Sequence, residues 1–162
     1  IAGQLKSPVF LGTEQEYFHS ARQLIENAKS GDRIALQMYE FENGATNGDK
    51  DAAKAAPGYA DQQALLGDLT DAAKRGVDVD VVLDGSKHPK TKQLLNGPIV
   101  DALRQAAQQT GHITLDIYPA NTVNIDHAKE LLYMTPANGG YAVQTALVGG
   151  SNWGNHTPAN DD

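Results

Sequence analysis

The protein has 162 residues, of which 40% are hydrophobic and 20% are charged, a profile typical of one globular domain. No run of about 18 apolar residues occurs, so no membrane-spanning segment is expected. The sequence contains no cysteine, which excludes disulfides, thiolate metal sites and thiol nucleophiles. Its formal net charge of −7 disfavours duplex nucleic acid as a partner, because neutralisation of phosphates drives such binding.

The first part of the chain predicts two strands around one helix. Residues 8–11 are an apolar run typical of a strand. Thr13 lies three residues before a glutamate, which is the spacing of a capping box, and a helix is expected from there to about residue 30. Residues 33–41 are apolar on both faces, which predicts a central strand. Residues 42–58 are polar and rich in glycine, which indicates a surface loop.

The middle of the chain repeats this alternation. A helix is expected at about 60–74, a strand at 77–83 and a polar loop at 84–93. A second helix at about 98–109 and a strand at 112–118 follow. Repeated strand–helix–strand alternation predicts an α/β sandwich with a mostly parallel sheet.

The last part of the chain predicts a hairpin that carries reactive groups. Residues 124–134 and 141–149 are strand-like and are joined by a turn rich in Asn and Gly. His127 and Lys129 are two residues apart, so on a strand their side chains project from the same face. Such a pair suits phosphodiester chemistry, with the imidazole attacking phosphorus while the ammonium holds the non-bridging oxygens.

The segment after the hairpin adds further polar groups. The second strand ends in Gly149 and Gly150, which allow a ligand to approach the backbone closely. Asn152 follows and could donate a hydrogen bond to a phosphate. Asp161 is the type of carboxylate that fixes the tautomer of a catalytic imidazole.

Simpler interpretations exist for each of these features. A His-x-Lys pair on a strand is usually a solvated edge, and a Gly-Gly-Ser-Asn-Trp run is a plausible turn. Glu40, at the end of a predicted strand, could face the mouth of the site or simply face solvent. His88 and its neighbouring lysines 87, 90 and 92 could meet a phosphate or a lipid headgroup, or form a solvated loop. The order and spacing of the hairpin motifs favour the functional interpretation.

With these motifs the sequence resembles the phospholipase D superfamily. The signature of that superfamily is His-x-Lys-x4-Asp on one strand, followed by a strand that closes in Gly-[Ser/Gly]-x-Asn. Here His-Ala-Lys occupies 127–129, and Gly149 to Trp153 follow at the expected distance. The segment 157–161 resembles the one whose acidic residue pairs with the catalytic histidine. The resemblance spans nearly the whole chain and implies a phospholipase D-like α-β-α sandwich.

Two departures from the signature matter. Met134 stands where the signature has Asp, as in relatives of the tyrosyl-DNA phosphodiesterase type, which lack the Asp and keep His, Lys and Asn. The active site of the family also joins two halves, each with one His-x-Lys, whereas this sequence has one. The resemblance therefore implies that residues 1–162 form one domain, an N-terminal half that is incomplete at its C-terminus. It implies a partner that carries a second His-x-Lys, either a separate chain or a second copy.

The resemblance also implies a function and a set of site residues. The function is a phosphodiesterase acting through a phosphohistidine, with phospholipid favoured over nucleic acid as substrate, no metal or other cofactor, and a secreted or periplasmic location. His127 would be nucleophile or acid. A nuclease, or a non-catalytic module that keeps the fold for binding or assembly, is the alternative. The implied catalytic residues are His127, Lys129, Asn152 and Asp161, and the implied substrate-binding residues are Ser151, Trp153 and His156.

Overall fold

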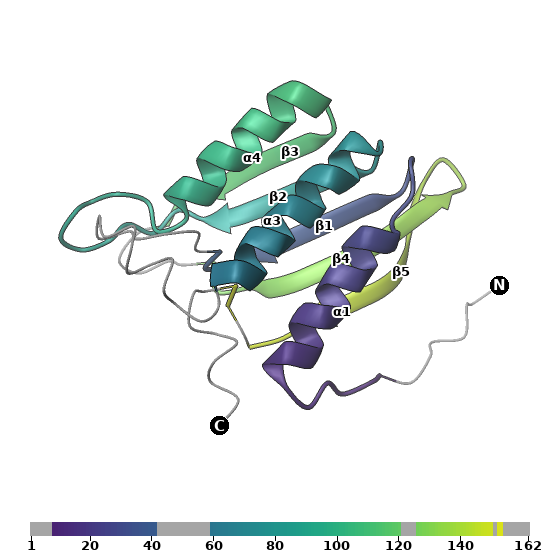
Figure 1. Ribbon diagram of the computed structural model, residues 1–162, viewed down its shortest axis with the longest axis horizontal. Helices are drawn as coiled ribbons and strands as arrows, with labels where there is room; N and C mark the ends of the chain where they lie inside the picture. The colour runs from purple at the N-terminus through teal and green to yellow at the C-terminus, as the bar shows by residue number, and fades with distance from the viewer. Residues whose placement is uncertain (1–7, 42–58, 121–125, 151, 154–162) are drawn as a thin grey trace.

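The chain folds around one five-stranded sheet, and the computed structural model describes residues 8–41, 59–120, 126–150 and 152–153. The strand order is β3-β2-β1-β4-β5 (Figure 1). The strands are β1 (Arg33–Met38), β2 (Asp78–Asp84), β3 (Ile113–Tyr118), β4 (Lys129–Ala137) and β5 (Gly140–Val148). The strand predicted at 33–41 is therefore the middle strand of the sheet, as its two apolar faces indicated.

Three helices connect and cover these strands: α1 (Glu14–Asn27), α3 (Tyr59–Lys74) and α4 (Gly97–Thr110). The predicted capping box begins α1, since the Thr13 side chain accepts from the Glu16 backbone and the Glu16 carboxylate accepts from the Thr13 backbone. Gly111 adopts a left-handed conformation with φ 71° and ends α4, which is the usual role of glycine at this position.

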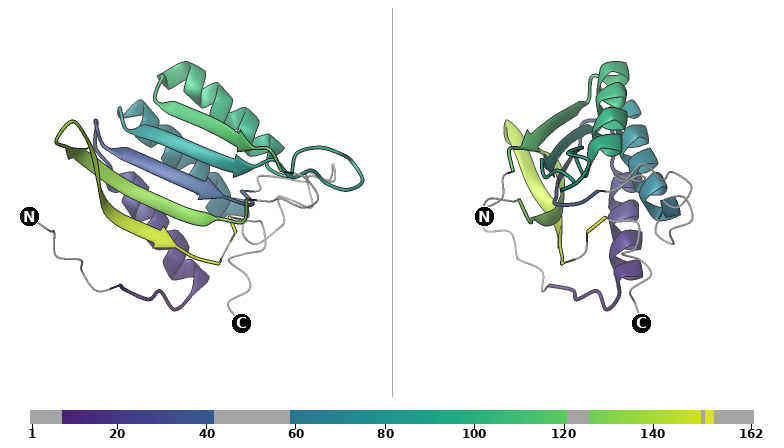
Figure 2. Two further views of the ribbon diagram at one scale, coloured as in Figure 1. Left: turned by 180° about the vertical axis from the view of Figure 1, so that it is seen from behind. Right: turned by 90° about the vertical axis from the view of Figure 1, so that its left-hand side faces the viewer.

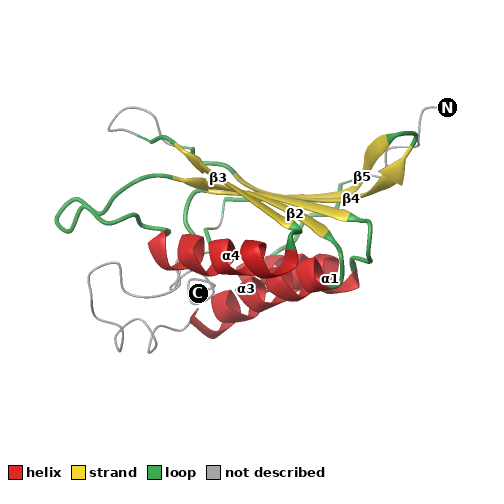
Figure 3. Cartoon of the chain, turned by 90° about the horizontal axis from the view of Figure 1, so that it is seen from above, coloured by secondary structure: helices red, strands yellow, loops and turns green. Residues whose placement is uncertain are grey.

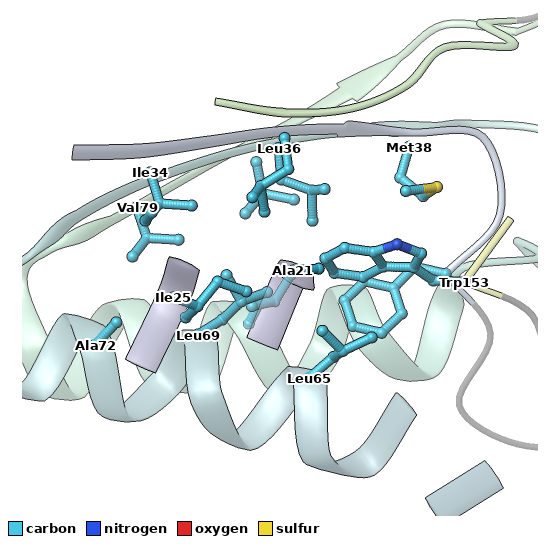
Figure 4. Packing of buried hydrophobic residues seen from close by; sticks show 14 of the residues in the cluster. Ala21, Ile25, Ile34, Leu36, Met38, Leu65, Leu69, Ala72, Val79 and Trp153 are labelled. Atoms are coloured by element: carbon cyan, nitrogen blue, oxygen red, sulfur yellow. The ribbon is translucent and has the colours of Figure 1, made fainter. Parts of the chain in front are cut away.

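The hydrophobic core lies between the sheet and the helices. Burial alternates along β1 and β2, so every second side chain of each strand faces the helices. Figure 4 shows Ile34, Leu36 and Met38 of β1 pointing toward the helix residues below them. The largest fully buried side chains come from nearly every element of the fold: Trp153, Phe41, Ile25, Ile34, Leu36, Met38, Leu65, Leu69, Leu83, Ile99, Leu103 and Leu131.

The prediction of a mostly parallel sheet is only partly confirmed. β1 pairs with β2 and β2 with β3 in parallel, but β4 pairs with both β1 and β5 in an antiparallel direction. The parallel half comes from strand–helix–strand units, which local sequence patterns reveal. The antiparallel half arises because the C-terminal hairpin adds to the free edge of β1, a pairing between distant segments that no local pattern specifies.

All three described helices cover the same face of the sheet (Figures 2 and 3). The described residues therefore supply one of the two helix layers expected of an α-β-α sandwich. On the other face, the Tyr141 hydroxyl donates to Asp78, and the Arg33 guanidinium lies 4.3 Å from the centre of the Tyr141 ring. His112 Nδ1 lies 3.0 Å from Asp78 as well. This polar network joins residues of β1, β2 and β5 on a face that carries no described helix.

The strand predicted at 8–11 is wrong, because these residues form no strand. Val9 and Phe10 are 83% and 92% exposed. Residues 8–14 and 146–150 line a common cavity of about 570 Å³, so the segment lies near the edge of β5 without pairing to it. An apolar run becomes a strand only when it forms hydrogen bonds with a neighbouring backbone, and residues 8–11 form no such ladder with the described strands. The loop predicted at 42–58 lies outside the described residues.

Candidate active site

Three segments of the chain meet at one end of the sheet. The parallel strands β1 and β2 both end there, and β4 begins there because it runs antiparallel to β1. β5 ends at the same place because it runs antiparallel to β4. The segments that meet are 39–41, 126–129 and 149–153, with residue 151 outside the described part of the chain. His127 and Lys129 lie in the segment 126–129, and Asn152 lies in the segment 149–153.

A buried amide fixes the ends of β1 and β2 relative to each other. Asn96, which is 1% exposed, donates from Nδ2 to the backbone carbonyls of Tyr39 and Asp84, each at 2.9 Å. Its Oδ1 accepts from the backbone N–H of Phe41 at 2.7 Å. Buried backbone groups need such partners. Asn96 therefore sets the position of the residues that follow β1.

A second set of hydrogen bonds holds the segment that precedes β4. The Asp84 carboxylate accepts from the backbone N–H of Asp126 at 2.7 Å. The Asp126 carboxylate in turn accepts from Gln37 Nε2 at 2.7 Å. The backbone N–H of Tyr39 donates to the carbonyl of Ala128 at 2.9 Å. The residue between these anchors, at position 127, is thereby held against both β1 and β2.

The ring of Tyr39 contacts both members of the His-x-Lys pair. The His127 ring lies 4.7 Å from it between centroids, at an angle of 50°, and His127 is exposed. Lys129 Nζ lies 5.3 Å from the centre of the same ring and donates to the carbonyl of His127 at 3.0 Å. Lys129 is only 4% exposed. An exposed imidazole and a buried ammonium therefore lie around one aromatic ring.

Burial and nearby carboxylates act on Lys129 in opposite directions. Burial lowers the pKa of Lys129 below its ordinary value, and the negative charges of Glu40 and Asp126 partly restore it. Burial is also the main cause that raises the pKa of Tyr39, with contributions from Glu40 and Asp84. The buried ammonium of Lys129 is therefore balanced by the carboxylates of Glu40 and Asp126.

Asn152 is oriented by Glu40. Its Nδ2 donates to Glu40 Oε2 at 3.0 Å, and its Oδ1 is buried with no hydrogen-bond partner among the described residues. The backbone carbonyl of Glu40 also accepts from the N–H of Trp153 at 2.9 Å, so the segment after β5 is attached to the end of β1. Nδ2 has a second hydrogen, which donates to none of the described residues.

The substrate-binding role predicted for Trp153 does not fit its position. The side chain is 0% exposed and lies among the core residues (Figure 4). It packs against Phe41, at 4.9 Å between ring centroids, and against Phe18, at 6.4 Å. A large aromatic ring gains more from complete burial in a core than from a half-exposed place beside a ligand. Three other predicted residues, Ser151, His156 and Asp161, lie outside the described residues.

Sequence reasoning missed several residues that build the site. Tyr39 could have been found, because it follows the central strand directly at the end where β4 was expected to bring His127. Asp84 is the last residue of β2, whereas the sequence pattern predicts it as the first residue of the polar loop 84–93. The sequence shows Asn96 only as a short polar residue ahead of a helix. Its structural role could not be predicted, because its three backbone partners lie 12 to 57 residues away along the chain.

Two kinds of site do not occur in the part of the chain that the structure describes. No three His, Asp or Glu side chains there gather closely enough to hold a metal ion. No described helix has the length and apolar character needed to cross a membrane.

Comparisons with known proteins bear on the fold. No family model matches the sequence, and no curated protein matches it either. Among solved structures, the chain is similar to a phospholipase D family member, Nuc, from Salmonella typhimurium, at 22% identity over 86% of this chain and 67% of that chain, with a TM-score of 0.47. It is also similar to polyphosphate kinase from Porphyromonas gingivalis, at 21% identity over 85% of this chain, with a TM-score of 0.51. The likeness to polyphosphate kinase shows a shared arrangement of strands and helices with part of that chain.

The α/β fold that the motif resemblance implied is confirmed, with the described helices on one face of the sheet. This chain spans 19% of the polyphosphate kinase chain, so it corresponds to a small part of that protein. At these identities the likeness concerns the arrangement of strands and helices, and the reaction of this chain has to be argued from its own residues.

Proposed function

We propose that the chain is one half of a phosphodiesterase of the phospholipase D type, with a phospholipid as the favoured substrate. The observation that carries the proposal is the grouping of His127 and Lys129 around the Tyr39 ring, next to the Glu40 carboxylate that holds Asn152. His127 is exposed and can reach a substrate, while Lys129 and Asn152 offer N–H groups for phosphate oxygens.

The proposed reaction has two steps. A ring nitrogen of one histidine attacks phosphorus, the bond from phosphorus to the leaving alcohol breaks, and a second, protonated histidine gives its proton to the departing oxygen. That second histidine then takes a proton from water, whose oxygen attacks phosphorus and breaks the phosphorus–nitrogen bond. Lys129 and Asn152 hold the non-bridging oxygens in both steps. His127 is one of the two histidines.

The test is hydrolysis of bis(p-nitrophenyl) phosphate and of phospholipid vesicles by the purified chain. We expect His127→Ala to lower the rate by at least about 10³-fold, because it removes the nucleophile or the proton donor. His19→Ala is the matched control, since His19 is an exposed histidine on α1. Hydrolysis that survives in His127→Ala would remove this site from the reaction. No hydrolysis by the wild-type chain, alone or with its partner half, would instead favour a non-catalytic module.

The reaction also needs a second histidine, which we propose comes from a partner chain or a second copy. While the nitrogen of His127 is bonded to phosphorus, the same imidazole cannot protonate the leaving oxygen. If the partner is a second copy, specific activity should rise with protein concentration as pairs form. An excess of His127→Ala chain should then inhibit the wild-type chain by forming mixed pairs.

Sedimentation and activity measured on the same samples check this requirement. Full specific activity from a verified monomer would contradict it. If a separate chain supplies the histidine, the isolated chain should stay inactive at every concentration until that chain is added.

A nuclease is the second candidate, and one observation favours it. Lys87, Lys90 and Lys92 are exposed on the loop that follows β2, at the same end of the sheet as His127 (Figure 1). Exposed lysines there could contact successive phosphates of a nucleic-acid strand. Hydrolysis of single-stranded DNA that exceeds phospholipid hydrolysis and falls steeply with salt would favour this candidate.

A further inference from the structure

Glu40 places a negative charge inside the candidate phosphate site. It is the second residue after β1, is half-buried, and accepts from Asn152 Nδ2 at 3.0 Å. Its charge also reaches Lys129, as the effect on the pKa of that lysine shows. The two residues that would bind phosphate oxygens therefore share one carboxylate, although a carboxylate ordinarily repels phosphate.

The charge of Glu40 acts differently on two classes of ligand. A phosphodiester carries one negative charge, whereas a phosphomonoester or inorganic phosphate carries up to two near neutral pH. Lys129 is 4% exposed, so its charge and that of its neighbours are poorly screened by water. Because Glu40 accepts a hydrogen bond from Asn152, a phosphate held by Asn152 would lie near its carboxylate, and each additional negative charge on the ligand would be repelled.

We propose that Glu40 is a specificity-determining residue that makes this site accept singly charged phosphodiesters and reject doubly charged phosphate groups. The inference rests on the proposed function, because it presumes that phosphate oxygens bind between Lys129 and Asn152. It also gives Glu40 a part in turnover. Hydrolysis of a diester yields a monoester with a second ionisable oxygen, and Glu40 repels that product once it has ionised.

Charge and hydrogen bonding at Glu40 can be separated by two variants. In Glu40→Gln the side-chain carbonyl still accepts from Asn152, while the negative charge is gone. In Glu40→Ala both are lost, so Asn152 is no longer oriented. Glu130→Gln is the matched control, because Glu130 lies next to Lys129 on β4 but points to the opposite face of the sheet, where it pairs across from Gln37.

The experiment measures binding of dimethyl phosphate and of inorganic phosphate by nuclear magnetic resonance of the His127 ring. It is done at about pH 8, where inorganic phosphate is mainly the dianion and dimethyl phosphate the monoanion. We expect Glu40→Gln to improve the affinity for inorganic phosphate relative to dimethyl phosphate by roughly fivefold. Glu40→Ala should show the same change in ratio with weaker binding of both ligands, and Glu130→Gln should leave the ratio unchanged.

The outcomes separate this inference from the proposed function. If both ligands bind near His127 and their affinity ratio is the same in wild type, Glu40→Gln and Glu130→Gln, the role of Glu40 is refuted while the phosphate site stands. If neither ligand shifts the His127 signals in wild type or in Glu40→Gln, no phosphate site exists there and both proposals fail. Circular dichroism of each variant verifies that the fold is kept.

Discussion

Asn96 shows how much of the candidate site depends on one side chain that no ligand would touch. Its amide is buried and makes three hydrogen bonds to backbone groups of Tyr39, Phe41 and Asp84. Tyr39 in turn contacts His127 and Lys129, and the Asp84 carboxylate binds the backbone of Asp126. Asn96 therefore acts on the reactive residues through the backbone that carries their neighbours.

We predict that Asn96→Ala lowers the free energy of unfolding by about 3 kcal/mol, because it leaves buried backbone groups without partners. Urea denaturation followed by circular dichroism measures the change. Gln108→Ala removes an exposed amide from α4 and should shift the free energy by no more than about 0.5 kcal/mol. Equal, small losses in the two variants would mean that the three hydrogen bonds of Asn96 contribute little.

The edge strand β5 has few of the features that usually protect a sheet edge. None of the residues from Gly140 to Val148 is charged, and Val143 and Val148 are 56% and 73% exposed. Edge strands in stable monomers commonly carry lysine, proline or bulges that prevent pairing with other chains. β5 has one such feature, a register shift opposite Tyr133 and Met134, and neither of the two exposed valines is replaced by a charge.

We predict that the chain associates through this edge and that Val148→Lys reduces the association. The new lysine would stand directly across from Glu130 on β4, so the folded state gains a cross-strand ion pair and should not lose stability. Sedimentation velocity over a range of concentrations measures the effect. Val148→Thr is the control, since it keeps a β-branched side chain without adding charge, and it should associate like wild type. If both variants associate as wild type does, contacts elsewhere are responsible.

The sequence predicts features that depend on local contacts and misses features that depend on contacts between distant segments. The start of α1 at Thr13, the end of α4 at Gly111 and the hairpin turn are local signals, and the structure has all three. The helix expected to reach residue 30 ends at Asn27, because the Ala28 N–H closes the last turn by donating to Ile25. The strand at 8–11 fails because its existence depends on a partner strand.

The site follows the same rule. His127, Lys129 and Asn152 form a recognisable motif around one hairpin, with Lys129 at the start of β4, His127 just before it and Asn152 after β5. Tyr39 and Glu40 come from the end of β1, and their contacts with the motif depend on the pairing of β1 with β4. That pairing joins segments that are remote in sequence, which periodicity and spacing do not reveal.

At the scale of the whole molecule, the described chain is a sheet with helices on one face (Figures 1 and 3). The candidate site, with an exposed His127, lies at one end of that sheet. The uncovered face carries the network of Arg33, Asp78, Tyr141 and His112. An exposed His127 and an open β5 edge both leave room for a second half. Both features favour a reaction completed by another polypeptide.

The antiparallel joining of β4 to β1 also has a consequence for the order in which the molecule folds. Gln37 and Asp126, which that pairing brings together, are 89 residues apart, and Asp32 and Tyr133 are 101 residues apart. The unit of β1, α3 and β2 closes through much shorter loops and so forms more readily. The end of the sheet that carries the candidate site is therefore expected to assemble late, after the unit of β1, α3 and β2.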